Sequence, residues 1–468
     1  MAILRKDTEV FMSVTIQPEE SIKNEIKPLN EIRPLSEEEQ KMCMKAAWRL
    51  IPLLGVAYFF NYLDRTSVGY AALQMSAQLG LGPAQFGLGA GIMFFGYCLC
   101  EVPSNLAMYR FGARLWLSRI MITWGCVAAM MVFVVGPWSF YSIRLLLGIA
   151  EAGFFPGVIY FLSIWFPVQF RTRVLAWFTV ATPISFLVGG PLSTSLLQLH
   201  GFLGMDGWQW MFLIEGVPAC LLGFVALRRL ADRPEQANWL TEKEKVTFSR
   251  MMQIGGEGPS QSQHFRSVLK DVRVWLLSGI TFSYTLGTYG IGIWLPQMLK
   301  AEGIETTTIG WLAAIPYFFS TLGLIFWARA VDKSGRGVMH LIAALLLAAL
   351  ALMLSLYLDS LVPALIGVTF ALVGTLSAKT IFFTLPGKFL RGQAAAGGIA
   401  LINALGAFGG FVGPFLMGVA KEMTHSFTAG MMLMGCIIMF AAFLAVILLI
   451  IMRPVNLEET QGGVSLGK

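Results

Sequence analysis

The chain has 468 residues, of which 56% are apolar and 13% are charged, and its formal net charge is +7. Soluble domains carry about 25% charged residues, so a soluble protein of this composition would lack the polar surface to cover itself, and lipid is the solvent that fits. The positive charge does not indicate nucleic acid, because the basic residues lie in a polar tail and in short loops instead of on one face of a folded domain. We therefore expect a lipid bilayer around the chain and no nucleic-acid partner.

The N-terminal stretch, residues 1–45, is polar and rich in glutamate. It contains no apolar segment of the kind that a cleaved signal peptide requires. We expect this stretch to form a cytoplasmic tail, and the first apolar span after it to act as an uncleaved signal-anchor.

Twelve stretches are long and apolar enough to cross a membrane as helices, which takes about 20 mainly apolar residues. A polar stretch, residues 229–272, separates the sixth from the seventh. The pattern predicts an all-α membrane protein with two six-helix bundles, residues 46–228 and 273–452, joined by that cytoplasmic linker and followed by a cytoplasmic tail at 453–468. The expected spans are residues 47–70, 86–108, 115–135, 139–161, 173–199, 208–228, 274–297, 309–329, 338–358, 362–384, 393–419 and 428–452.

Basic residues are divided unevenly between the two sides of these spans. Short loops on one side hold ten lysines and arginines, whereas the other side holds two, Lys300 and Lys421. Cytoplasmic loops carry the excess of basic residues, so we expect both termini in the cytoplasm. The ten residues are Arg110, Arg114, Arg119, Arg171, Arg173, Arg329, Lys333, Arg336, Lys388 and Arg391.

The two halves carry similar landmarks at one constant offset. Gly112 and Gly335, in the basic loops after the second and eighth spans, are 223 residues apart. Gly190 and Gly413, each followed by proline, are separated by the same 223 residues. The offset predicts a six-plus-six duplication, and transporters built from two such parallel halves bind their substrate near the membrane midplane.

Charged residues inside apolar spans are the strongest functional signals, because each costs several kcal/mol unless it faces a partner or a polar cavity. Asp64 and Arg65 lie in the first span. Adjacent residues point about 100° apart on a helix, so each needs its own partner or a shared aqueous cavity. The alternative is that both are hydrated at the periplasmic interface, although the apolar sequence continues after them.

The fourth span carries Arg144 and Glu151. Seven residues are about two helical turns, so these side chains share one face. A carboxylate that moves between wet and dry surroundings gains and loses a proton, which suits a proton carrier. Arginine stays charged and can bind a carboxylate through two parallel hydrogen bonds, which suits an anion site. A structural ion pair with another helix remains the alternative for Glu151.

Four further residues are weaker candidates. Lys379, in the tenth span, either binds substrate or extends to the cytoplasm, and Asn403, in the eleventh, either binds substrate or joins two helices. Tyr62 and Tyr97 are placed to line a cavity, but tyrosine is also common at membrane interfaces.

No motif supports an enzyme. The chain has no glycine-rich phosphate-binding loop followed by lysine and serine or threonine, and its four histidines are not spaced as metal ligands. We therefore expect no catalytic residues, no metal and no cofactor. A receptor or a lipid-handling enzyme would need a large soluble domain or a catalytic cluster, and the sequence offers neither.

The charged motifs resemble those of the major facilitator superfamily and, more narrowly, the bacterial branch of the anion:cation symporter family, which includes tartrate, phthalate, hydroxyphenylacetate and sugar-acid permeases. The resemblance covers most of residues 45–452. It rests on Asp64-Arg65, Glu101 to Asn105, Arg144 to Gly157, Trp165-Phe166-Pro167, Gly207 to Gly216 and Ala394 to Asn403.

The resemblance implies proton-coupled uptake of a small organic anion by alternating access, with the proton as the coupling ion. It also implies a location in the bacterial inner membrane, and we expect a monomer. It assigns the proton to Asp64 and Glu151, the anion to Arg65 and Arg144, and the cavity lining to Tyr62, Tyr97 and Asn403. Lys379 has no counterpart in the pattern and is an additional substrate-binding candidate. Tyr109-Arg110 departs from the superfamily pattern, which usually has aspartate before the basic residue.

Two questions stay open at the level of sequence. Aromatic residues favour an aromatic acid as substrate, whereas two arginines and a lysine favour a dicarboxylate or a sugar acid. An exporter or an exchanger of similar acids is the alternative to uptake.

Overall fold

The computed structural model describes residues 35–254, 269–357, 360–386 and 392–452. These residues form helices joined by short turns, with no strand among them. The helices are α1 (Glu37–Gln78), α2 (Pro83–Phe111), α3 (Ala113–Ala129), α4 (Pro137–Glu151), α5 (Phe154–Trp165), α6 (Val168–Thr179), α7 (Ala181–Leu197), α8 (Gly207–Arg229), α9 (Glu242–Ile254), α11 (Val272–Ala301), α12 (Thr306–Ser334), α13 (Gly337–Ser355), α14 (Leu361–Phe382), α15 (Gly392–Thr424) and α16 (Thr428–Met452).

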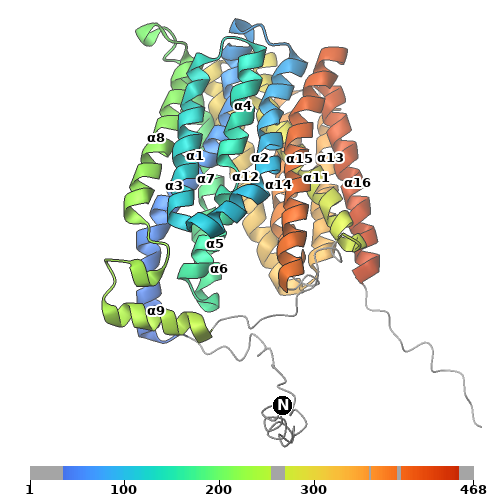
Figure 1. Ribbon diagram of the computed structural model, residues 1–468. Coiled ribbons are helices and arrows are strands. Elements are labelled where there is room, and N and C mark those ends of the chain that lie inside the picture. Colours follow the sequence, from blue (N-terminus) through green and yellow to red (C-terminus); the bar gives the residue numbers. More distant parts are fainter. Residues whose placement is uncertain (1–34, 255–268, 358–359, 387–391, 453–468) are drawn as a thin grey trace, which may run out of the picture.

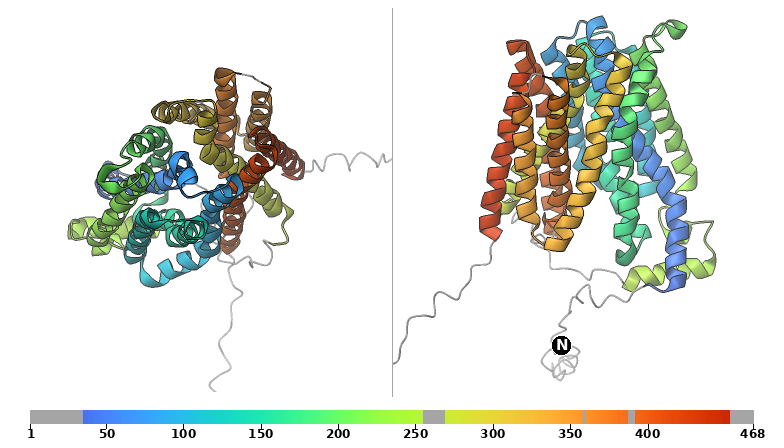
Figure 2. Two further views of the ribbon diagram at one scale, coloured as in Figure 1. Left: turned by 90° about the horizontal axis from the view of Figure 1, so that it is seen from above. Right: turned by 180° about the vertical axis from the view of Figure 1, so that it is seen from behind.

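The long helices stand side by side in two groups, with α1 to α8 forming one and α11 to α16 the other (Figures 1 and 2). The short helix α9 lies across the lower end of the first group in Figure 1. On that same side α1 begins and α16 ends. The all-α membrane fold with two bundles that the sequence predicts is therefore confirmed. Residues 1–34 of the expected N-terminal tail and the whole expected C-terminal tail, 453–468, lie outside the described residues. The basic residues Lys388 and Arg391 also lie outside them.

The number of spans needs one qualification in the second half. Eleven helices or helix pairs in the described part are long and apolar enough to cross a membrane. The remaining long helix is α11, where 274–297 was expected to span, and it falls short because glycine, serine, threonine and tyrosine dilute its apolar residues. It packs against α15, α16, α14 and α1, so neighbouring helices cover much of the surface that lipid would otherwise meet.

The first helix is longer than the expected span. Its start is fixed by Ser36 and Glu39, which bond to each other's backbone amides in a capping box. Residues 37–45, expected in the tail, are therefore helical. The extra length also places Asp64 and Arg65 well inside α1 instead of at its end.

The fourth span is broken in the middle. Glu151 ends α4, and Gly153 then has a φ of +87°, a conformation that glycine adopts at little cost. The break frees the carbonyl of Ala152, which accepts a hydrogen bond from the Ser104 hydroxyl at 2.7 Å. Trp116 donates to the same hydroxyl at 3.0 Å. The break is thus supported by neighbouring helices, and it places Glu151 at a helix end in the protein interior.

The two halves meet closely at the end away from α9. There Gly190 of α7 faces Gly310 of α12, and a Cβ on either would come within 2.6 Å of the other's carbonyl oxygen. Gly69 of α1 lies equally close to the carbonyl of Ile293. Glycine permits this backbone-to-backbone approach between helices, so the halves are sealed together on that side.

Candidate functional site

An ion pair joins α1 and α4 in the interior of the first half, where it faces the second. The Arg65 guanidinium binds Oε1 of Glu151 through Nη2 and through Nε, the latter at 2.5 Å. Asn61, one turn earlier on α1, donates to the same oxygen at 2.6 Å. Glu151 is fully buried. The ion pair with another helix, left open by the sequence, is therefore present.

Asp64 points to a different partner from Arg65, as the sequence predicts for adjacent residues. Its Oδ2 accepts a hydrogen bond from Nε1 of Trp124 at 2.8 Å. Its other oxygen has no hydrogen-bond partner in the described part of the chain. Because Asp64 is only 1% exposed, the alternative that it is hydrated at the periplasmic interface does not hold.

Arg144 has two unpartnered buried nitrogens, more than any other buried side chain that the structure describes. It is fully buried, and its one hydrogen bond runs from Nη2 to the carbonyl of Ala90 at 3.3 Å. Its Nε and Nη1 lack a hydrogen-bond partner among the described residues, although the carboxylates of Asp64 and Glu151 are near enough to interact with it electrostatically. Buried guanidinium nitrogens without an acceptor are unfavourable. The two unpartnered nitrogens of Arg144 are therefore suited to binding an anion.

Tyrosines surround the Arg65 guanidinium and connect it to the second half. Its carbon lies 5.0 Å from the ring centre of Tyr97 and 5.4 Å from that of Tyr62, distances typical of cation–π contacts. Across the interface, Nη1 donates to the Tyr289 hydroxyl of α11 at 3.4 Å.

Lys379 reaches the same cluster from α14. Its Nζ donates to the Tyr62 hydroxyl at 3.1 Å. The lysine therefore points to the centre of the molecule, not to the cytoplasm. Four predicted site residues, Tyr62, Arg65, Tyr97 and Lys379, thus lie together at the junction of the two halves.

Asn403 is the predicted residue that the structure does not join to this cluster. It lies half-buried on α15, and its side chain has no hydrogen bond within the described part of the chain. Its neighbour Ala404 accepts a hydrogen bond from the Cys98 thiol of α2 at 3.2 Å. Asn403 is therefore near the helix that carries Tyr97, without a contact that defines a role.

Two buried carboxylates were not assigned a role from the sequence. Glu215 of α8 is 2% exposed and accepts a hydrogen bond from the Ser193 hydroxyl at 3.2 Å. Glu101 of α2 is 7% exposed. Each has one oxygen without a partner among the described residues. Both occur in apolar spans, so the rule that identified Glu151 would also have found them.

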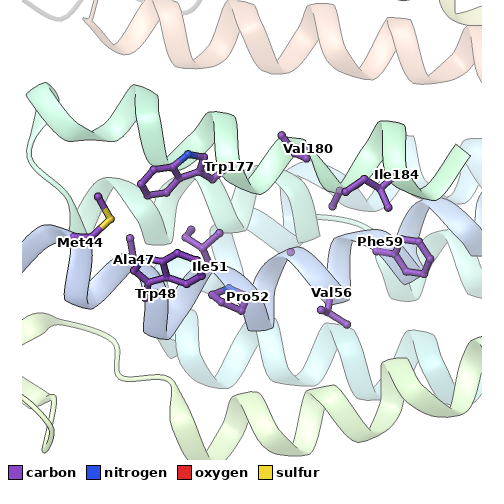
Figure 3. A pocket seen from close by; sticks show the side chains of 12 residues that line it. Met44, Ala47, Trp48, Ile51, Pro52, Val56, Phe59, Trp177, Val180 and Ile184 are labelled. Carbon is purple, nitrogen blue, oxygen red and sulfur yellow. The ribbon is translucent and has the colours of Figure 1, made fainter. Parts of the chain in front are cut away.

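An apolar groove lies away from these charges. It has a volume of about 650 Å³ and runs between the first half of α1 and α6–α7, lined by apolar side chains (Figure 3). Its polar content is too low to recognise a small anion, so the buried charges remain the candidate site.

The sequence matches the family model of the major facilitator superfamily over residues 54–414 and 277–465. A protein of Agrobacterium vitis named "Putative tartrate transporter" is 44% identical over 88% of this chain and 92% of its own. A protein of Acinetobacter baumannii named "Quinolone resistance transporter" is 40% identical over 87% and 95%.

Solved structures agree with the fold. A bacterial homologue of the human lysosomal transporter Spinster, crystallised in an inward-facing, occupied conformation, superposes with a TM-score of 0.68 over 85% of this chain and 96% of its own, at 16% identity. The fold, the family match and the relatives describe a transporter and not an enzyme. The chain belongs to the major facilitator superfamily, and its resemblance to the organic-acid permeases of that superfamily is supported.

Proposed function

We propose that this transporter takes up a small organic anion together with protons, by alternating access between the two sides of the bacterial inner membrane. The observation that carries the proposal is Arg144, a fully buried guanidinium with two nitrogens unpartnered in the described residues. A carboxylate substrate would supply the missing acceptors in the bidentate geometry that arginine favours. The tartrate in the name of a 44% identical relative points to the same chemistry.

Arg65 and Lys379 would complete the anion site. Both lie near Tyr62, one in each half of the protein. A ligand that binds both would join the halves around itself, as alternating access requires. Tyr62 and Tyr97 would then line the site, and Asn403 would contribute from α15 once the halves close further. Two or three cations suit a dicarboxylate or a sugar acid.

Glu151 and Asp64 would carry the protons. While Glu151 is ionised, it occupies Arg65. Protonation would weaken this pair and free the guanidinium for the substrate. Entry of an anion into a negative-inside cell is opposed by about 2.3 kcal/mol per charge per 100 mV, and co-transported protons offset that opposition. No metal or organic cofactor enters this scheme, and one chain contains all the proposed groups.

Export is the second candidate, and one observation favours it. A relative named for quinolone resistance is 40% identical over nearly the same length. Quinolone antibiotics carry a carboxylate beside an aromatic ring system, so an anion site rich in tyrosine fits them as well.

Proteoliposomes containing the purified protein test both candidates. We expect tartrate, a sugar acid or an aromatic acid to accumulate when the lumen is more alkaline than the outside, and not without a gradient. Accumulation of a quinolone under the opposite gradient, with none of the acids taken up, would establish export instead. Arg144→Gln in the same preparation serves as the inactive control.

A further inference from the structure

A second groove, here called the α1–α8 groove, combines basic and apolar side chains on the exposed face of α1. It has a volume of about 590 Å³ and is formed by the first turns of α1, the last turns of α8 and the segment before α9. Its lining residues are Lys45, Trp48, Arg49, Pro52, Leu53, Val56, Leu222, Val225, Arg229 and Trp239.

The two arginines of this groove, unlike its lysine, are not paired with a carboxylate among the described residues. Lys45 is neutralised by Glu244 of α9 at 2.8 Å. Arg49 lies over the ring of Trp239, 5.2 Å from its centre, and Arg229 belongs to the last turn of α8, where a cation favours the helix dipole. Neither arginine forms an ion pair with a described residue. The groove therefore presents two guanidiniums to a ligand.

Apolar side chains continue from the arginines toward the middle of the helices. Leu53 and Val56 of α1 face Leu222 and Val225 of α8 across the groove. On the other side of α1 lies the apolar groove of Figure 3, and the two share Trp48, Pro52 and Val56. A ligand bound here would have an anionic end at Arg49 and Arg229 and long apolar chains beside α1.

The level of the groove along the helices indicates that such a ligand comes from the membrane and not from solution. Trp48 is 74% exposed at the end of α1 that lies by α9, and exposed tryptophan is typical of the boundary between lipid headgroups and acyl chains. Basic pockets at this level between transmembrane helices bind anionic lipid headgroups. A soluble anion would gain nothing from the apolar lining.

We propose that the α1–α8 groove binds an anionic phospholipid, with its phosphodiester at Arg49 and Arg229 and its acyl chains along α1. This lipid would pack against the helix that carries Asp64 and Arg65. The site is independent of the transported substrate and holds whether the protein imports or exports.

Native mass spectrometry of the purified protein measures the binding. Phosphatidylglycerol and phosphatidylcholine of identical chains are added at equal concentrations. We expect phosphatidylglycerol to remain bound preferentially to the parent protein. In Arg49→Gln/Arg229→Gln, its binding should weaken about 25-fold, because each arginine contributes roughly fivefold.

The matched control is Arg110→Gln/Arg228→Gln, which removes the same charge from exposed positions that do not line the groove. It should bind phosphatidylglycerol like the parent. Equal retention of the two lipids by the parent protein overturns the proposal even if the groove variant does not fold. Equal weakening in the control pair also overturns it, because the effect would then be one of net charge. Competition by glycerophosphoglycerol, which has the headgroup without chains, at the same concentration as the lipid would identify a soluble phosphodiester as the ligand and reject the lipid.

Discussion

At the scale of single residues, the structure separates two kinds of buried charge. Glu151 is held by Arg65 and Asn61, although both bind only its Oε1 and its Oε2 has no partner among the described residues. Arg144, in contrast, forms no ion pair there and has two unpartnered nitrogens, and one oxygen of Asp64 is also unpartnered. The sequence identified all of them by one rule, that a charge in an apolar span needs a reason. It could not show that Arg65 pairs with Glu151, because the contact joins residues 86 positions apart and depends on how α1 is rotated.

Neutralising Glu151 should separate binding from coupling. Glu151→Gln resembles the protonated carboxyl and leaves Arg65 free, so substrate binding and counterflow exchange should persist. Accumulation driven by a pH gradient should fall to the background. Paired counterflow and gradient assays in proteoliposomes give the answer, with Glu242→Gln, on exposed α9, as the control. If Glu151→Gln accumulates substrate as the parent does, then Glu151 is structural.

Removing the charge of Arg144 should weaken anion binding strongly. Arg144→Gln lacks the cation, and Arg144→Lys provides only a point charge, so lysine should restore little. We expect affinity to fall at least about tenfold, since buried charged hydrogen bonds contribute roughly 1.5–3 kcal/mol. Isothermal titration with the transported acid measures the change. Affinity equal to the parent in Arg144→Gln would remove this residue from the site.

At the scale of helices, composition predicted most elements but not their interruptions. The capping residues Ser36 and Glu39 form a recognisable signal for the start of a helix. They nevertheless fall in the predicted tail, because residues 1–45 are polar. The break after Glu151 depends on Ser104 of another helix, and no local pattern reports such a partner. Gly190 is a landmark of the internal repeat in the sequence, and its role in packing, like its partner Gly310, is known only from the structure.

Adding one methyl group at the seal between α7 and α12 should therefore destabilise the molecule. Gly190→Ala would push its Cβ into the carbonyl of Gly310, and overpacking of this kind costs about 1–3 kcal/mol. Gly55→Ala is the matched control, because a Cβ there meets nothing within 4 Å and alanine favours a helix. Thermal unfolding in one detergent should show a lower midpoint for Gly190→Ala alone; equal midpoints would refute the tight contact.

The attachment of α9 to α1 should depend on pH in a defined direction. The pKa of Glu244 lies below its usual 4.5, chiefly because Lys45 donates to its carboxylate and also because the amide of Thr241 does. A lowered pKa means that this contact stabilises the folded state fully at neutral pH and is lost as the pH falls through the lowered value.

Hydrogen exchange of the α9 amides measures this attachment. Glu244→Gln should accelerate exchange about two- to fivefold at pH 7, as befits an exposed pair. Glu242→Gln, whose partner Lys245 lies within α9, should leave the contact with α1 intact. Equal acceleration in the two variants would show that helix propensity, and not the Lys45 contact, governs α9.

At the scale of the whole molecule, the division into two similar halves was predictable from the sequence. It shows in the apolar spans, in the polar stretch that separates the sixth span from the seventh, and in landmarks at a fixed offset. The contact between Lys379 and Tyr62 was not, since it joins residues 317 positions apart in different halves. Hydropathy alone does not identify α11 as a membrane span. Its polar side chains face other helices and are not in contact with lipid.

The membrane orientation that the basic loops predict can be tested by labelling. In a background without the six native cysteines, Leu203→Cys, before α8, should react with an impermeant maleimide added to intact cells. Val246→Cys, on α9, should react only after permeabilisation. Both positions are well exposed, at 76% and 68%, so access to the side chain does not limit either reaction. The reverse pattern would invert the proposed topology.

The position of the ion pair has a consequence for the speed of the transport cycle. Arg65 and Glu151 both belong to the half that would move as one body, so the pair can stay intact while the halves rock. The contacts that cross the centre, Lys379 to Tyr62 and Arg65 to Tyr289, end on phenol hydroxyls, which water can replace at little cost. We therefore expect the empty carrier to reorient readily, and the outer glycine seal, rather than electrostatic attraction between the halves, to set its activation barrier.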